Sequence, residues 1–563
     1  MTATILFLIL GGFTLLLLSR RALNRIKLSR AKHRSLTGHA RIARLITNLI
    51  PAYHYNEEQF FNSDSAPAEA LRRRREGFEW LRLEFQRRFR KSLDASAVAS
   101  GALADLQFTS RYRVPFQYAD YLRKHVRIPS IVVKSEGVLV EDLDGNCFYD
   151  LTGSYGVNLF GYDFYKTCIA QAQEMASSLG PVLGSYHPCV IEVTRLLSQI
   201  SGKEQFTFHM SGTEAVMQAV RLARYQTGRS HLVRFCGAYH GWWDDVQPGP
   251  GNPTVVSHTY TLQDMSQRSL DVLRTRSDIA CVLINPLQAL HPNKNAPNDS
   301  SLIDSSRSAQ FNRAQYTAWL HEVRTVCTEK GIALIFDEVF VGFRLAKGGA
   351  QEYFGVSADL VVYGKTLGGG LPVGVVAGNL EWMRRFREDR PAHICLARGT
   401  FNAHPYVLCA MYCFLRQLET PEISSLYSRI DHRWDSWAER FNQAFERHDL
   451  PCRVSNLSSI WTVTFTQPSR YNWMLPYYLR LEGVALSWVG TGRLIFSLNF
   501  TDQDMSAVLQ RFERAAQRMV EHGWWYLGDP SMSNASIRKS VLSEMLSARF
   551  RLPKAYASLP PES

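Results

Sequence analysis

The 563-residue chain lacks several patterns that define well-known protein classes. Its ten cysteines include no C-x-x-C pair and no regular framework, and no group of histidines and cysteines has the spacing of a metal site. We therefore expect reduced thiols in a cytoplasmic compartment and no bound metal. No internal repeat is present, which argues against a repeat architecture. With 45% hydrophobic and 20% charged residues, the composition is that of a globular protein that can bury sizeable cores.

Residues 1–18 contain no charged side chain, and basic residues follow them at once. A secretory signal would carry its positive charges before the apolar core and a cleavage site after it, and neither is present. Eighteen helical residues span about 27 Å, which is enough to cross a thin bilayer core. The segment therefore predicts a single-pass transmembrane anchor, with the basic side and the catalytic domain in the cytoplasm. An amphipathic or buried helix is the alternative.

The formal charge of +13 is concentrated outside the part of the chain that carries the chemical motifs. Residues 19–100 contain 18 Lys and Arg against 8 Asp and Glu. Within them, 72–91 place Phe78, Leu81, Phe85 and Phe89 on one helical face and basic residues on the other. Such a helix could lie on an anionic membrane surface or pack on the rest of the protein. No recognised nucleic-acid module accompanies the charge, so we expect no nucleic-acid partner.

Between positions 331 and 374, two apolar runs predict buried strands that end in chemically reactive residues. The apolar run 332–336 delivers Asp337 and Glu338, and the run 360–363 delivers Lys365 beside several glycines. Ligands of open α/β sheets bind at the carboxyl ends of the strands. Lys365 can form a Schiff base, and Asp337 can keep a pyridinium nitrogen protonated, which together are the protein's share of pyridoxal phosphate chemistry.

A candidate phosphate site lies upstream, where the strand in residues 205–210 leads into a helix. Ser211 is placed as the N-cap and Glu214 follows three residues later, which predicts a capping box. The first backbone N–H groups of the helix, with the hydroxyls of Ser211 and Thr213, would suit an anion.

The segment DEVFVGFRLAKGGAQEYFGVSADLVVYGKTLGGGLPVGVVAG resembles the lysine region of class III aminotransferases, most of all the glutamate-1-semialdehyde aminotransferase branch. The chain is also similar to aminotransferase domains of polyketide and nonribosomal assembly lines. The similarity extends from about Val114 to Asp529. It implies a fold-type-I α/β enzyme with a mostly parallel sheet, a smaller α+β domain, and pyridoxal 5'-phosphate as the cofactor.

The resemblance also implies roles for individual residues. Lys365 and Asp337 would be catalytic, and the full set of cofactor-binding residues would be Ser211, Gly212, Thr213, Tyr239, His240, Asp337, Val339, Lys365 and Thr400. Tyr239 would stack on the cofactor ring, Val339 would pack against its face, and Thr400 would reach the phosphate of a neighbouring chain. The last role implies a homodimer with a shared active site.

Several positions bear on the substrate. Asn285-Pro286 replaces the family's glutamate-proline pair, and Trp242 and Trp243 add two large aromatics beside the expected pocket. In the segment 154–156, Tyr155 is either a substrate contact or ordinary core. Arg113 and Arg344 are two candidates for binding a substrate carboxylate, and the sequence does not choose between them.

These features divide the chain into an anchor (1–18), a basic linker with an amphipathic helix (19–105), a small domain from both ends of the catalytic region (106–165 and 418–528), a large cofactor-binding domain (166–417) and a surface tail (529–563). The expected reaction is amino transfer from an amino acid to an aldehyde or ketone, with a lipid-like or polyketide-derived acceptor at the membrane. A 2,1-aminomutase and a membrane-tethered, non-catalytic scaffold are the alternatives.

Overall fold

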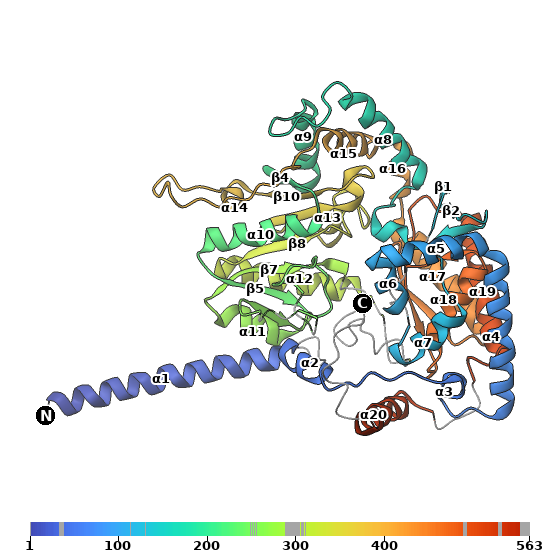
Figure 1. Ribbon diagram of the computed structural model, residues 1–563. Coiled ribbons are helices and arrows are strands. Elements are labelled where there is room, and N and C mark those ends of the chain that lie inside the picture. Colours follow the sequence, from blue (N-terminus) through green and yellow to red (C-terminus); the bar gives the residue numbers. More distant parts are fainter. Residues whose placement is uncertain are drawn as a thin grey trace. The chain divides into compact units, whose positions relative to one another are not determined.

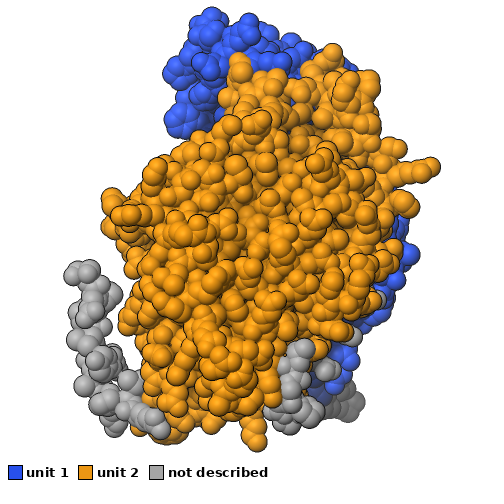
Figure 2. Space-filling view, turned by 90° about the vertical axis from the view of Figure 1, so that its right-hand side faces the viewer, with its two compact units in different colours: residues 1–45, 171–296, 312–415 blue, residues 46–170, 297–311, 416–563 orange. Residues whose placement is uncertain are grey.

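The computed structural model describes residues 2–32, 39–112, 114–129, 131–247, 249, 251–252, 254, 256–287, 305, 309, 311–487, 492–526 and 532–551. The chain forms two compact units, which Figure 2 shows in different colours. Unit 1 contains Met1–Leu45, Gln171–Ala296 and Asn312–Leu415, and unit 2 contains Ile46–Ala170, Pro297–Phe311 and Arg416–Ser563. Each unit is therefore assembled from segments that lie far apart in the sequence.

Unit 1 is built on a seven-stranded sheet with the strand order β4-β10-β9-β8-β7-β5-β6 (Figure 1). The strands β5 to β9 pair in parallel, whereas β10 runs antiparallel to both of its neighbours. The predicted mostly parallel sheet is therefore confirmed. The strands are β4 (Gln205–His209), β5 (His231–Phe235), β6 (Thr259–Leu262), β7 (Ile279–Ile284), β8 (Ala333–Asp337), β9 (Leu360–Gly364) and β10 (Gly374–Gly378).

Helices cover the sheet of unit 1, and every residue of β7, β8, β9 and β10 is buried. Both faces of these strands are covered, which explains why they read as continuous apolar runs rather than as alternating ones. On one face, Ala215, Ala219 and Leu222 of α10 belong to the same buried cluster as residues of the central strands. The helices are α9 (Cys189–Ser201), α10 (Gly212–Thr227), α11 (Gln267–Thr275), α12 (Arg313–Lys330), α13 (Gly349–Phe354), α14 (Leu380–Met383) and α15 (Pro405–Gln417).

The N-terminal segment differs from its prediction. It forms one helix, α1 (Thr2–Ala31), which continues through the basic residues that were expected to lie beyond a membrane (Figure 1). Its last residue joins unit 1, because Ala31 is buried and its carbonyl accepts a hydrogen bond from the Gln263 N–H at 2.9 Å. Among the helices in the described ranges, none has the length and apolar character needed to cross a membrane. The predicted transmembrane anchor, and the single-pass location derived from it, are therefore wrong.

Unit 2 contains two smaller sheets, with strand orders β1-β2-β3-β13 and β11-β12-β14. The Asp144-Gly145 pair is a hairpin signal in the sequence, and β2 and β3 pair antiparallel around this turn, in which Gly145 has a φ of 79°. Strand β13 then pairs in parallel with β3, which brings the two ends of the catalytic region into one sheet. The strands are β1 (Lys134–Glu136), β2 (Leu139–Glu141), β3 (Cys147–Asp150), β11 (Cys452–Leu457), β12 (Ile460–Phe465), β13 (Val484–Ala485) and β14 (Arg493–Ile495).

Helices from both ends of the chain pack in unit 2, and α2, α8 and α15 cross the boundaries between the units in the sequence. The helices are α2 (Ala40–Thr47), α3 (Glu57–Phe61), α4 (Ala68–Arg88), α5 (Arg90–Ala102), α6 (Ala104–Tyr112), α7 (Phe116–His125), α8 (Tyr162–Ala176), α16 (Pro421–Leu426), α17 (Ile430–Arg447), α18 (Leu475–Leu481), α19 (Asp502–Glu521) and α20 (Asn534–Arg551).

The basic amphipathic stretch packs inside unit 2 as α4. Its apolar face is buried, with Phe78, Leu81, Phe85 and Phe89 all at most 4% exposed. The structure thus shows the second of the two alternatives, packing on the protein rather than on a membrane. Arg74 is itself buried and forms two 2.7 Å contacts with the carboxylate of Asp64.

The C-terminal segment also differs from the expected surface tail. Residues Asn534–Arg551 form α20, in which Ile537 and Val541 are buried. Glu544 of this helix accepts a 2.7 Å hydrogen bond from the buried Arg470. The helical pattern was missed because only these few residues face the protein and the remaining positions are mostly polar.

Replacing Asp64 with Asn tests whether α4 is a structural part of unit 2. The variant leaves the guanidinium of Arg74 buried without its counter-charge, so we expect a loss of about 3–5 kcal/mol in the free energy of unfolding. Urea denaturation followed by circular dichroism would measure it. Glu69→Gln is the matched control, because Glu69 pairs with Arg72 of the same helix at the surface. An equally stable Asp64→Asn variant would contradict this role of the pair.

Candidate active site

The carboxyl ends of β8 and β9 bring the two main sequence candidates to the same edge of the sheet. The strands are parallel neighbours, and Asp337, the last residue of β8, is opposite Val362 of β9. Lys365 follows three residues later, directly after β9. The carboxylate and the amine interact electrostatically. The structure thus places Asp337 and Lys365 together as the sequence predicts.

Asp337 is 2% exposed and is held by two hydrogen bonds. Its Oδ2 accepts a bond of 2.7 Å from Nδ1 of His240, and its Oδ1 accepts a bond of 3.2 Å from the Val339 N–H. Burial lowers the pKa of His240, although the carboxylate opposes this shift. The Nε2 atom of His240 is buried without a hydrogen-bond partner among the described residues. The sequence had placed His240 only near the site, and the structure shows it paired with Asp337.

Lys365 occupies an unusual backbone conformation and an unusual environment for an amine. Its φ is 48°, in the left-handed region that costs a residue with a Cβ atom of order 1 kcal/mol or more. Burial lowers the pKa of its ammonium group, the nearby Arg344 lowers it further, and Asp337 acts in the opposite direction. A lysine with a lowered pKa is more often unprotonated and can therefore act as a nucleophile or a base.

The predicted phosphate site is a helix N-terminus, formed where β4 leads into α10. Ser211 is the N-cap, and its hydroxyl accepts a hydrogen bond of 3.2 Å from the Glu214 N–H. The predicted capping box is only half present, because Glu214 accepts from the Met210 N–H instead of the Ser211 N–H. The first N–H groups of a helix have no partner within it, so those of Gly212 and Thr213 are suited to an anion.

Val339 connects this helix start to the two strand ends. A Cβ atom on Gly212 would lie 2.8 Å from Cγ1 of Val339, and one on Gly364 would lie 3.2 Å from the same atom. A Cβ atom on Gly241 would lie 2.5 Å from the Thr213 hydroxyl oxygen. Larger residues at these glycines would collide with the side chains that line the site, so the glycines let the three segments approach closely.

Tyr239 and Asn285 lie on neighbouring segments of the same unit. The Tyr239 ring is 64% exposed, and its backbone carbonyl accepts a hydrogen bond of 3.4 Å from the Asn285 side-chain amide. An ionised glutamate at position 285 could not donate this bond. Asn285 therefore supports the Tyr239 backbone, a role that the sequence did not reveal. Trp242 is 72% exposed, whereas Trp243 packs partly against the core of unit 1.

Two further charged residues near the strand ends are buried. Glu338 accepts hydrogen bonds from the N–H groups of Ala350, at 2.6 Å, and Gln351, at 3.2 Å, so it caps the start of α13. Burial raises the pKa of Glu338 to about 8. Arg344 is 1% exposed, and its guanidinium lies 5.9 Å from the centre of the Phe340 ring. Glu338 therefore stabilises the start of α13. Arg344 lowers the pKa of the Lys365 ammonium group.

The remaining candidates are not brought to this cluster. Thr400 is exposed, and no contact between described residues connects it to Lys365 or Asp337. Ser154 and Tyr155 belong to unit 2 and have positive φ values of 45° and 57°. Tyr155 is 54% exposed, so it is not an ordinary core residue. Arg113 lies outside the described residues.

Comparisons with known proteins agree with this arrangement of residues. The family model described as "Aminotransferase class-III" matches residues 121–516. A glutamate-1-semialdehyde 2,1-aminomutase of Alkaliphilus oremlandii is 32% identical over 414 residues, which cover 69% of this chain and 92% of that protein. The protein of the same name from Methanocaldococcus jannaschii is 29% identical over 368 residues, covering 61% and 78%.

Solved structures show the same fold. A structure described as a transaminase with PLP bound is 27% identical, has a TM-score of 0.59, and covers 70% of this chain and 92% of its own. A glutamate-1-semialdehyde aminomutase from Pseudomonas aeruginosa has a TM-score of 0.64 at 18% identity, covering 80% and 99%. At that identity the second match supports the fold alone.

The side chains at the two strand ends suit the cofactor that this family uses. The cluster offers an amine with a lowered pKa, a buried carboxylate, and a helix start whose glycines leave no room for side chains. These are the groups needed to hold a phosphorylated pyridine aldehyde. The family match covers more than half of the chain. The protein therefore belongs to the class III aminotransferases and is a transaminase that depends on pyridoxal 5'-phosphate.

Proposed function

We propose that the protein transfers an amino group from an amino-acid donor to an aldehyde or ketone, with Lys365 and Asp337 as its catalytic residues. The observation that carries this proposal is the parallel pairing of β8 and β9, which places the Asp337 carboxylate and the Lys365 amine at one sheet edge. When bound, pyridoxal phosphate supplies an electron sink for the carbon that bears the amino group.

Lys365 has two roles in this proposal. Its Nζ atom would hold the cofactor, and the same atom would move a proton at the donor's amino-bearing carbon, first as general base and then as general acid. Burial favours both roles because it lowers the pKa of the amine. Asp337 would accept a hydrogen bond from the pyridine nitrogen and keep it protonated, and His240 holds the carboxylate through the 2.7 Å hydrogen bond.

The other cofactor contacts follow from the same geometry. The start of α10, with Ser211, Gly212 and Thr213, would bind the phosphate through backbone N–H groups and hydroxyls. Val339 would pack against one face of the pyridine ring, and Tyr239 would stack on the ring as a flat, polarisable surface. The large exposed area of Tyr239 is consistent with a residue that a cofactor covers.

A 2,1-aminomutase is the second candidate, because relatives that are 29–32% identical carry that name. Asn285 argues against it, since a family carboxylate is replaced by an amide that binds the Tyr239 carbonyl. The exposed Trp242 favours an acceptor with an apolar part. The expected acceptor at a membrane is not retained, because its main support was the anchor. The non-catalytic scaffold is also set aside, because the protein is a transaminase.

Donor specificity and Lys365 can be tested together. We expect the visible absorbance of the bound cofactor to change with one amino acid, such as L-glutamate or L-alanine, and the corresponding keto acid to appear. Lys365→Ala should lower kcat by at least about 10³-fold, because the nucleophile and the proton carrier are lost together. Lys330→Ala is the control, because Lys330 is an exposed lysine at the end of α12, and this variant should keep full activity.

The same assay separates the two candidate reactions. A transaminase consumes a donor and releases a keto acid, whereas an aminomutase converts a single substrate into its isomer without one. Isomerisation of glutamate-1-semialdehyde without net donor consumption, and no turnover with any donor and carbonyl pair, would contradict the proposed transfer.

The pH dependence of Lys365 tests the electrostatics of the site. We expect Lys365 of the cofactor-free protein to react with trinitrobenzenesulfonate with a midpoint below 10.5, the ordinary pKa of lysine, because burial disfavours the ammonium form. Asp337→Asn should move the midpoint further down, since the carboxylate stabilises the charged amine. Arg344→Met should move it up. Peptide mass spectrometry resolves the labelled lysine, and the exposed Lys330 is followed as a surface lysine in the same digest.

Thr400 is proposed to bind the cofactor phosphate of a partner chain, which makes the active enzyme a homodimer. Lys365→Ala and Thr400→Ala chains can be co-expressed with different tags and the mixed dimers purified. Each mixed dimer contains one site with both Lys365 and Thr400 intact if the residues come from different chains. We expect that site to recover the wild-type affinity for pyridoxal phosphate. No recovery relative to the Thr400→Ala dimer would place both residues in the same chain or assign Thr400 no role.

A further inference from the structure

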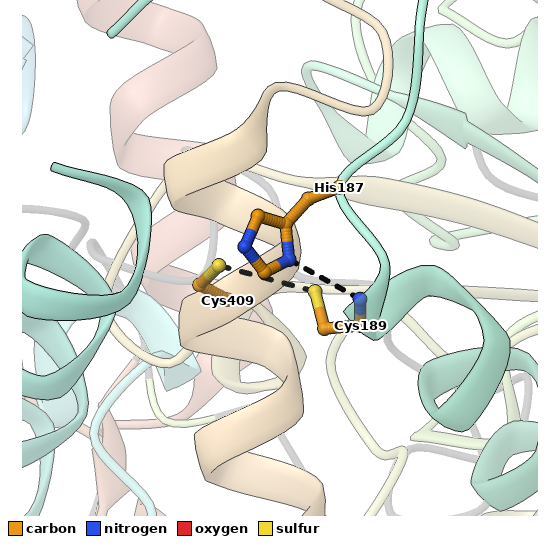
Figure 3. Close-up of side chains that lie close together, drawn as sticks. All are labelled: His187, Cys189 and Cys409. Atoms are coloured by element: carbon orange, nitrogen blue, oxygen red, sulfur yellow. Dashed lines mark hydrogen bonds between the residues drawn. The ribbon is translucent and has the colours of Figure 1, made fainter. Parts of the chain in front are cut away.

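Three side chains with metal-ligand chemistry meet in unit 1, and none of them belongs to the group of residues around Lys365 and Asp337. They are His187, Cys189 at the start of α9, and Cys409 in α15. Figure 3 shows the imidazole and the two sulfur atoms turned toward one another from these separate segments. One ligand atom from each residue lies within 4.8 Å of the other two. No local spacing in the sequence indicates this group, because 220 positions separate the two cysteines.

The distance between the two sulfur atoms fits two thiolates on one metal ion. The Sγ atoms of Cys189 and Cys409 are 3.9 Å apart. Two sulfurs at 2.3 Å from a tetrahedral zinc ion are about 3.8 Å apart. A disulfide would need about 2.0 Å, so the observed separation requires little movement for metal binding and more for oxidation.

The third side chain is held in a form that suits a metal. The Cys189 N–H donates a hydrogen bond of 3.2 Å to Nδ1 of His187, so Nδ1 carries a lone pair and the ring proton lies on Nε2. This bond fixes the ring close to the sulfur that follows it two residues later. Neutral imidazole is the metal-binding form of histidine. Metal binding through Nδ1 exchanges the amide hydrogen bond for a bond to the ion.

The two thiols are also not equivalent. The Sγ atoms of Cys189 and Cys409 share a hydrogen bond in which either thiol can donate, and this bond raises the pKa of Cys189 and lowers that of Cys409. Cys409 is fully buried and Cys189 is nearly so, whereas His187 is partly exposed and leaves an entry side. One turn further along α15, Cys413 donates to the sulfur of Met175 at 3.9 Å. The cluster is thus rich in soft sulfur atoms, which zinc and similar ions prefer over hard cations such as Mg²⁺.

We propose that His187, Cys189 and Cys409 form a binding site for a thiophilic divalent cation, such as Zn²⁺, with water at the fourth position. Binding forms two metal–sulfur bonds and one metal–nitrogen bond and releases the two thiol protons to solvent. The bound ion keeps its oxidation state, and no electron is transferred. The proposal does not depend on the transaminase reaction.

The site joins two segments that border the same cavity of unit 1. Residues 184–186, just before His187, and residues 398 and 402–403, just before α15, line a cavity of about 860 Å³. A metal at the ends of these segments would hold the start of α9 against α15. Its role is therefore structural, and the open fourth position is not required for amino transfer.

The test measures metal binding on the full-length, cofactor-loaded protein. After purification without chelators and with a thiol-free reductant, we expect about one zinc per chain by mass spectrometry of the elements. Replacing zinc with Co²⁺ should give the intense near-ultraviolet absorbance of a cobalt–thiolate bond. Removing the ion with a chelator should lower the melting temperature, and adding Zn²⁺ should restore it, since a ligand of the folded state stabilises it.

Variants identify the ligands. Cys189→Ser, Cys409→Ser and His187→Gln should each reduce the metal content to near zero, whereas Cys452→Ala, a buried cysteine of unit 2, should leave it unchanged. Circular dichroism and bound cofactor show whether each variant is folded. If a serine variant does not fold, two results still test metal binding. They are the cobalt spectrum of the wild-type protein and the metal content of the His187→Gln variant, in which the changed residue is partly exposed. Absence of stoichiometric metal under zinc-replete conditions, or a Cys189–Cys409 disulfide in the purified protein, would overturn the proposal.

Discussion

The parallel pairing of β8 with β9 is the constraint on which the active site depends. Both strands are buried along their whole length and packed on both faces, so a shift of either by one residue would exchange the side chains that fit the packing on each face. The register that buries them also sets Asp337 opposite Val362. The carboxylate and the Lys365 amine therefore occupy fixed positions that the fold maintains, and the loops do not need to place them.

This dependence explains which parts of the site could be predicted from the sequence. The apolar runs before Asp337 and Lys365 identify two strand ends without any knowledge of the fold, because parallel strands covered on both faces have a continuous apolar pattern. The cap at Ser211 could be recognised for a similar reason, since it depends on residues three positions apart. The pairing of His240 with Asp337 depends on the order of strands in the sheet, which local patterns do not contain.

Other features were missed because burial cannot be read from residue type alone. The sequence pattern of the basic stretch that forms α4 suits both a membrane surface and a protein core. In the structure, the buried ion pair between Arg74 and Asp64 stabilises its packing in the core. The apolar start of α1 satisfied the length rule for a membrane span, but the helix continues into a run of basic residues and ends against α11. Similarly, His187, Cys189 and Cys409 lie close only after α9 and α15 have packed.

The parallel pair formed by β3 and β13 has a consequence for synthesis on the ribosome. Val484 pairs with Tyr149, so about 330 residues must be translated between the two strands before their sheet can be completed. At typical rates of about 5–20 residues per second, the interval lasts roughly 20–70 s. During that time the apolar face of α4 and the free edge of β3 have no native partner from the later part of the chain. The order of translation therefore favours early closure of the unit 1 sheet and leaves unit 2 exposed to chaperones and to aggregation until its last helices emerge.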